Sequence, residues 1–82
     1  MKVVYVAPGK PAEVRDIGTA LKDLQEVVEG YIETVYPFDD NTCIICNEEG
    51  KLLGMPPNRL LRDEKGIVYD VLCGPFVVAG LG

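Results

Sequence analysis

One segment of the chain has the hydrophobic period of an α-helix, and the other patterned segments have the period of β-strands. From Ile17 to Val28 apolar residues recur at the i, i+3, i+4, i+7 spacing with polar residues between them. Thr19 is placed to cap the free amides at the start of this helix, and Gly30 to end it in the left-handed conformation. A lone amphipathic helix must bury its apolar face, so the pattern predicts a sheet beneath it.

Two strand patterns precede the helix. Residues 2–7 are rich in β-branched and aromatic side chains and end at Pro8-Gly9, which breaks regular structure. Residues 11–17 alternate apolar and polar side chains over a shorter stretch. The short connection between them predicts a β-hairpin.

More strand patterns follow the helix. They cover residues 31–38, 42–46, 51–53, 67–72 and 76–81. The segment 42–46 is apolar on both faces, as expected of a central strand, and Arg59-Leu60-Leu61-Arg62 after the double proline is predicted to form one helical turn. The expected fold class is α+β: one amphipathic helix packed on a mainly antiparallel sheet of five to six short strands, in the order strand-strand-helix-strand-strand-(strand)-strand-strand.

Length and composition restrict the class of protein. With 82 residues, of which 48% are hydrophobic, the chain is expected to fold as a single domain over residues 1–82 and not to be disordered. Its apolar runs are far shorter than the roughly 20 residues that cross a bilayer, so no membrane association is expected. Three cysteines without an export signal predict a cytoplasmic protein, and a net charge of −5 disfavours direct binding to nucleic acid.

The spacing Cys43-Ile44-Ile45-Cys46 is also found in zinc and thiol redox sites. On a strand, however, residues three apart point to opposite faces, so the two thiols cannot easily hold one metal. We therefore predict buried thiols that act as small hydrophobic side chains, with no metal site and no cofactor.

The residue types needed for common catalytic arrangements are absent from the sequence. The chain contains no histidine and no serine, and its paired carboxylates fall in predicted turns. The sequence therefore predicts a protein that is not an enzyme.

Candidate binding residues cluster at strand ends and turns. Tyr36, Phe38, Asp39 and Asp40 lie where an aromatic strand end meets an acidic turn, which is typical of partner interfaces. Asn47, Asn58 and Arg59 flank the later turn and the double proline, where they would order the loop or contact a ligand.

Several of these segments together resemble a known family. The segments are Tyr31-Ile32-Glu33-Thr34-Val35-Tyr36-Pro37-Phe38-Asp39-Asp40, Cys46-Asn47-Glu48-Glu49-Gly50-Lys51-Leu52-Leu53-Gly54, Asn58-Arg59 and Gly74-Pro75-Phe76. They resemble an uncharacterised domain-of-unknown-function family of small proteins from bacteria, phages and conjugative elements of Gram-positive gut bacteria. The resemblance covers residues 2–80 and implies no catalytic residues, but it makes Asn47, Asn58 and Arg59 the first positions to test.

Three functional hypotheses follow. The first is a non-catalytic interaction or accessory module of a mobile genetic element, which contacts a host or element-encoded protein through residues 31–58. The second is an acidic DNA mimic that inhibits a DNA-binding enzyme, and the third is a small-ligand or enzymatic site near Asn47 and Arg59. Homo-oligomerisation through an uncovered edge strand is a further expectation. The second hypothesis requires one acidic face that contains Glu26, Glu29, Glu33, Asp39 and Asp40.

Overall fold

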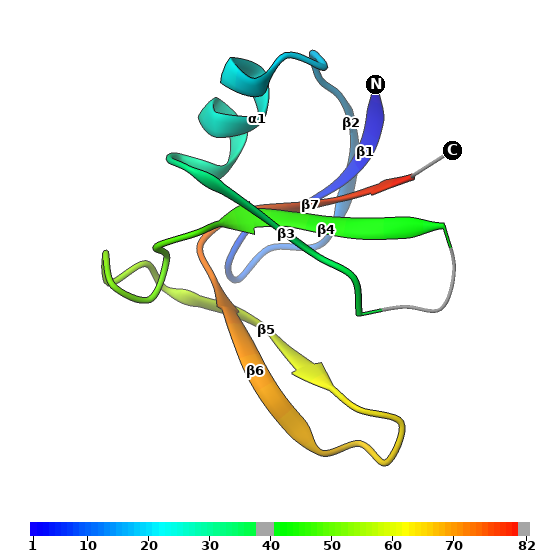
Figure 1. The fold of residues 1–82 in the computed structure, drawn as a ribbon, viewed down its shortest axis with the longest axis vertical. Helices are drawn as coiled ribbons and strands as arrows, with labels where there is room; N and C mark the ends of the chain where they lie inside the picture. The colour runs from blue at the N-terminus through cyan, green and yellow to red at the C-terminus, as the bar shows by residue number, and fades with distance from the viewer. Residues whose placement is uncertain (38–40, 81–82) are drawn as a thin grey trace.

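A computed structural model describes residues 1–37 and 41–80. Its elements, in chain order, are β1 (Lys2–Val6), β2 (Glu13–Asp16), α1 (Leu21–Val28), β3 (Ile32–Val35), β4 (Thr42–Asn47), β5 (Pro57–Arg62), β6 (Val68–Cys73) and β7 (Phe76–Gly80). The α+β class is confirmed, with the helix packed against the sheet (Figure 1).

The main sheet has five strands in the order β2-β1-β7-β4-β3, and all its neighbouring strands are antiparallel. The predicted hairpin of β1 and β2 is present, with Val4 opposite Val14. The last strand, β7, lies between β1 and β4 and joins the two halves of the chain. Strands β5 and β6 pair only with each other and form a separate hairpin.

The helix and this hairpin cover opposite faces of the main sheet (Figure 1). On the helix side, Leu24 and Val27 pack against a buried cluster of sheet residues, and Val28 is fully buried. That cluster contains Val3, Cys43, Ile45, Val77 and Ala79. These residues alternate along their strands with neighbours that point to the opposite face of the sheet, as period-two side-chain geometry requires.

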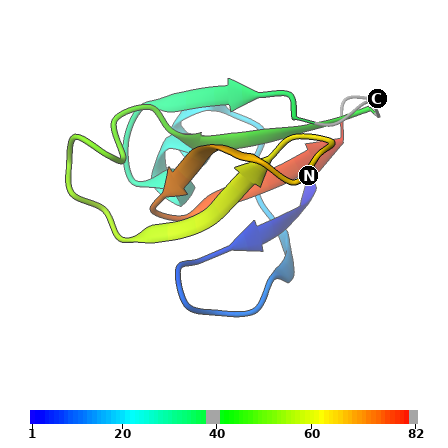
Figure 2. The ribbon, with the colours of Figure 1, turned by 90° about the horizontal axis from the view of Figure 1, so that it is seen from below.

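On the hairpin side, a second buried cluster joins the sheet to the arm formed by β5 and β6. Leu61 and Leu72 of the hairpin pack with Phe76 and Ile44 of the sheet. In Figure 2, which views the molecule from below, the hairpin lies in front of the central strands. Leu61 and Leu72 alone have buried hydrophobic side chains within β5 and β6, so most of the hairpin extends beyond the core.

The prediction that residues 42–46 form a central strand is confirmed, because β4 carries buried side chains on both faces. Cys43 belongs to the cluster on the helix side and Cys46 to the cluster on the hairpin side. The two thiols therefore point to opposite faces, as the strand geometry predicted, and both are free cysteines.

Both predicted helix ends are wrong in detail. The helix begins after Ala20, whose backbone N–H donates to Asp23 Oδ2 at 3.2 Å, so Asp23 rather than Thr19 satisfies the first turn. At the other end Glu29, with φ of 63°, takes the left-handed conformation that was expected of Gly30. Gly30 serves another purpose, because a Cβ there would lie 2.7 Å from Asn47 Nδ2.

Two other local predictions are also wrong. Residues 51–53 form a turn instead of a strand, because the Leu53 N–H donates back to the Glu49 carbonyl at 2.8 Å. Residues 59–62 lie within strand β5 instead of a helical turn, because they pair with β6 across the hairpin. A four-residue segment has too little pattern to decide between the two, and the distant partner strand decides it.

Candidate functional site

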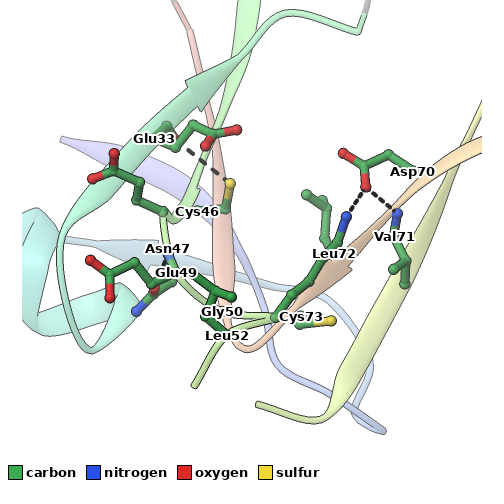
Figure 3. A pocket seen from close by; sticks show the side chains of 12 residues that line it. Glu33, Cys46, Asn47, Glu49, Gly50, Leu52, Asp70, Val71, Leu72 and Cys73 are labelled. Carbon is green, nitrogen blue, oxygen red and sulfur yellow. Dashed lines mark hydrogen bonds and ion pairs between the residues drawn. The ribbon is translucent and has the colours of Figure 1, made fainter. Parts of the chain in front are cut away.

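One hollow on the hairpin side of the molecule lies between the turn after β4 and strand β6. We call it the turn pocket; its volume is about 260 Å³ and its lining includes Glu33, Cys46, Asn47, Lys51 and Asp70. Figure 3 shows Glu33 and Cys46 on one side of this pocket and Asp70 on the other. The pocket combines a thiol, an amine and several carboxylates, which are groups that can take part in catalysis.

The Cys46 thiol is not activated. Burial raises the pKa of Cys46 to about 11, and the negative charges of Glu33 and Asp70 add to the effect. The thiol donates to the Glu33 carbonyl oxygen with an Sγ to O distance of 3.7 Å. A thiol with so high a pKa stays protonated at neutral pH, and the protonated form is a poor nucleophile and metal ligand.

The amine of the pocket, that of Lys51, is paired with a carboxylate. Lys51 Nζ donates to Asp70 Oδ1, and this pairing raises the pKa of Lys51 and lowers the pKa of Asp70. Asp70 Oδ1 further accepts from the Val71 N–H at 2.8 Å. Both groups are therefore charged at neutral pH, and neither is set up as a general base or a neutral amine nucleophile.

Asn47 lines this pocket, yet its side chain is engaged in holding the backbone. Asn47 Nδ2 donates to the Val28 carbonyl at the end of the helix at 3.0 Å, and Asn47 Oδ1 accepts from the Glu49 N–H at 2.7 Å. Among the residues that the structure describes, Asn47 is the polar residue that is buried. Asn47 therefore joins the helix to the turn after β4, and its amide is not directed at a ligand.

Asn58 and Arg59 fix the base of the hairpin to the main sheet. Asn58 Nδ2 donates to two carbonyls, those of Val6 and Gly74, each at 2.9 Å. Arg59 Nη1 donates to the Asn58 carbonyl at 3.0 Å, and Nη2 reaches the Lys10 carbonyl at 3.1 Å. Asn47 and Arg59 line different hollows, so the structure does not bring these two predicted residues into one site.

The second hollow is an apolar groove between β5 and the underside of the main sheet, which we call the β5 groove. Its volume is about 370 Å³, within the range of about 300–1,000 Å³ typical of ligand pockets. Ile44, Phe76 and Val78 of the sheet line one side, and residues 59–62 of β5 line the other. Arg59 and Arg62 are the only charged residues in its lining among the residues that the structure describes.

The predicted aromatic strand end lies beside this groove. Tyr36 is exposed just beyond β3, and the next residue, Pro37, lines the groove. The predicted residues Phe38, Asp39 and Asp40 lie outside the described residues. Sequence reasoning missed Leu60, Arg62 and Phe76 as site residues, because residues 57–62 show no period-two alternation that would mark a strand with a free apolar face.

No group of three or more His, Cys, Asp or Glu side chains among residues 1–37 and 41–80 is placed to hold a metal ion. Within the same described ranges, no helix is long and apolar enough to cross a bilayer.

Comparison with known proteins places the chain in a family but gives it no activity. Neither a search of curated proteins nor a search of solved structures found a match. The family model for Domain of unknown function (DUF3846) matches residues 1–82, which is the whole of the sequence. The chain therefore belongs to the DUF3846 family of domains of unknown function.

Proposed function

We propose that this chain is a non-catalytic protein-interaction module and that the hairpin of β5 and β6 is its partner-binding element. The observation that carries the proposal is the exposure of large apolar side chains on this hairpin. Leu60, Ile67, Val68 and Tyr69 are each between 42% and 60% exposed. Large exposed apolar side chains that gather on one element are a feature of sites where another protein binds.

Hydrogen bonds at its tip and base hold the hairpin in a fixed shape, which favours a role for its exposed side chains in binding a partner. At its tip, Asp63 Oδ1 accepts from the Lys65 and Ile67 N–H groups, each at 2.9 Å. At its base, Asn58 and Arg59 hold it to the sheet and to the loop after β1. A preorganised element loses less conformational entropy on binding than a flexible one.

The absence of activated groups in the turn pocket supports the non-catalytic part of the proposal. Cys46 is protonated at neutral pH, and Lys51 is paired with Asp70. An accessory role in a mobile genetic element stays a prediction that rests on the resemblance of the sequence alone.

The alternative of an acidic DNA mimic has less support, because Glu26 and Glu33, two of the acidic residues that it needs, do not share one face. Glu26 lies on the helix, while Glu33 lines the turn pocket with Cys46 on the other side of the sheet. A DNA mimic needs its carboxylates arranged like the phosphates of one duplex.

Affinity recovery from the cells that encode the chain tests the proposal. Wild type is compared with Leu60→Asp/Tyr69→Asp, which places charge on the hairpin, and with Leu52→Asp, which changes an apolar side chain that is 87% exposed in the turn after β4. We expect one reproducible partner with wild type and Leu52→Asp, and its loss with the double variant. Recovery that is equal for all three proteins, or no partner with wild type, would refute the proposal.

A further inference from the structure

We infer that the β5 groove receives an extended peptide segment of a partner protein, which adds as a strand to the free edge of β5 and carries carboxylates that meet Arg59 and Arg62. This inference rests on the proposed function, because it names the place and chemistry of the interaction. Three observations on the described residues carry it: a strand edge with no partner strand among them, an apolar floor, and two arginines with no acidic partner among them.

The unpaired edge follows from the topology. Strand β5 pairs with β6 on one side, and its other side has no partner strand in the described part of the chain. Four consecutive residues of β5, numbers 59–62, line the groove. Since neighbouring side chains on a strand point to opposite faces, a hollow that touches all four runs along the strand edge as well as its face. An extended segment in the groove can therefore reach the free N–H and C=O groups of β5.

The floor of the groove provides apolar contacts for alternate side chains of such a segment. Ile44 and Phe76 are buried beneath it, and Val78 is partly buried. Leu60, half exposed on β5, stands at its wall. A segment with apolar residues at every second position would direct them towards this floor while its other side chains face solvent.

The charge of the groove determines which residues of the partner segment lie beside its apolar positions. The chain as a whole carries −5, yet the charged side chains in the described lining are Arg59 and Arg62. Arg62 Nη1 donates to the Gly66 carbonyl at 3.1 Å, and Arg59 donates to carbonyls and to the side-chain oxygen of Asn58. Neither arginine has a carboxylate partner among the residues that the structure describes. A guanidinium group with free N–H donors binds a carboxylate strongly, so Asp or Glu is expected beside the apolar positions.

A second copy of this chain fits the groove less well than an acidic segment does. Symmetric pairing of two β5 strands about Leu60 and Leu61 would put Arg59 of one copy opposite Arg62 of the other. Like charges directly opposite each other destabilise an antiparallel pair. The groove therefore favours a partner of opposite charge over self-association.

Selection from a random decapeptide library displayed on phage tests the inference. Wild type is used for selection, and Leu60→Asp is used to remove peptides that bind elsewhere. We expect the enriched peptides to alternate apolar residues and to carry Asp or Glu next to them. Arg62→Gln should weaken a selected peptide several-fold, as is usual for a partly exposed charge pair, whereas Arg15→Gln on β2 should not change its affinity. An enrichment of basic peptides, or none, would overturn the inference.

Backbone methylation of a selected peptide tests strand addition itself. In a paired strand alternate N–H groups face the neighbouring strand, so N-methylation should abolish binding at every second position and leave it nearly unchanged between them. Equal tolerance at all positions would contradict strand addition. Self-association of wild type that Leu60→Asp abolishes would also overturn the inference, by making the groove an interface between copies. If affinity recovery depends on Leu60 but no peptide is enriched, the interaction module stands and the strand-addition site is wrong.

Discussion

Replacing Asn58 by alanine should loosen the hairpin from the main sheet and lower the stability of the whole chain. Asn58 Nδ2 donates to the carbonyls of Val6 and Gly74 at 2.9 Å each, across 52 and 16 residues of sequence. Each such hydrogen bond contributes about 1 kcal/mol, and a partly buried carbonyl left without a donor adds a penalty of similar size. We therefore expect Asn58→Ala to cost about 2–3 kcal/mol.

This cost is large compared with the total stability of a chain of this size. At about 0.05–0.15 kcal/mol per residue, 82 residues correspond to roughly 4–12 kcal/mol. With a urea dependence of about 1 kcal/mol per molar, the midpoint of unfolding should fall by about 2–3 M. Urea unfolding followed by far-ultraviolet circular dichroism measures this shift, with Asn41→Ala at an exposed asparagine as the matched control. A midpoint equal to that of the control would refute the conclusion that Asn58 holds the hairpin to the main sheet.

The variant Asn58→Asp tests the same two hydrogen bonds through pH, provided that Arg59 is also replaced. Arg59 Nη1 donates to Asn58 Oδ1 at 3.0 Å and would stabilise a carboxylate at position 58, so the comparison is between Asn58→Asp/Arg59→Gln and Arg59→Gln alone. Without this cation the carboxylate would face the carbonyl oxygens of Val6 and Gly74 and could donate to neither, so the pKa of the new carboxyl should be raised in the folded state. A folded pKa above the unfolded value makes stability fall as pH rises from about 4. We expect the double variant to be more stable relative to Arg59→Gln at pH 3.5 than at pH 7, and the opposite trend would contradict the two donated bonds.

Three other predictions concern the turn after β4 and its surroundings. Gly30→Ala should destabilise the fold by about 1–3 kcal/mol in urea unfolding, because its Cβ would lie 2.7 Å from the buried amide nitrogen of Asn47. Gly80→Ala, with open space around it, should stay within about 0.5 kcal/mol of wild type, and equal effects of the two substitutions would contradict the contact. Cys46, with a pKa of about 11, should carry about a hundredfold less thiolate at pH 8 than an ordinary cysteine. Iodoacetamide should therefore label the half-buried Cys73 first in the native protein, and preferential labelling of Cys46 would contradict its burial. The pKa of Asp70 is lowered by its partner Lys51, so the contribution of this ion pair to stability is present at neutral pH and lost as pH falls below about 4. Asp70→Asn should remove that part of the acid destabilisation. If the free energy of unfolding depends on pH in the same way in the variant and in wild type, the ion pair between Lys51 and Asp70 contributes nothing.

Elements with a long periodic pattern could be predicted from the sequence. The helix and the doubly buried strand β4 were found because their patterns are set by burial on one face or both. Strand β5 was missed because four residues around two leucines fit either a helical turn or a strand. Its pairing with β6 decides the conformation, and that contact is not visible in local sequence.

The candidate site was predicted in part. Asn47, Asn58 and Arg59 were identified as unusual polar residues near turns, and each does hold backbone in place. Their partners, such as the Val6 carbonyl 52 residues from Asn58, come together only in the folded chain. The β5 groove could not be predicted for the same reason, because its floor and its wall come from strands that meet only through the topology of the sheet.

Site-specific photo-crosslinking in the cells that encode the chain tests the central claim most directly. A photoreactive amino acid is placed at position 60, on the wall of the β5 groove, or at position 21, where Leu21 is similarly exposed on the helix across the sheet. We expect one discrete adduct from position 60, mapped by mass spectrometry to an extended acidic segment of the partner, and none from position 21. An adduct from position 21 alone, or from neither position, would contradict it.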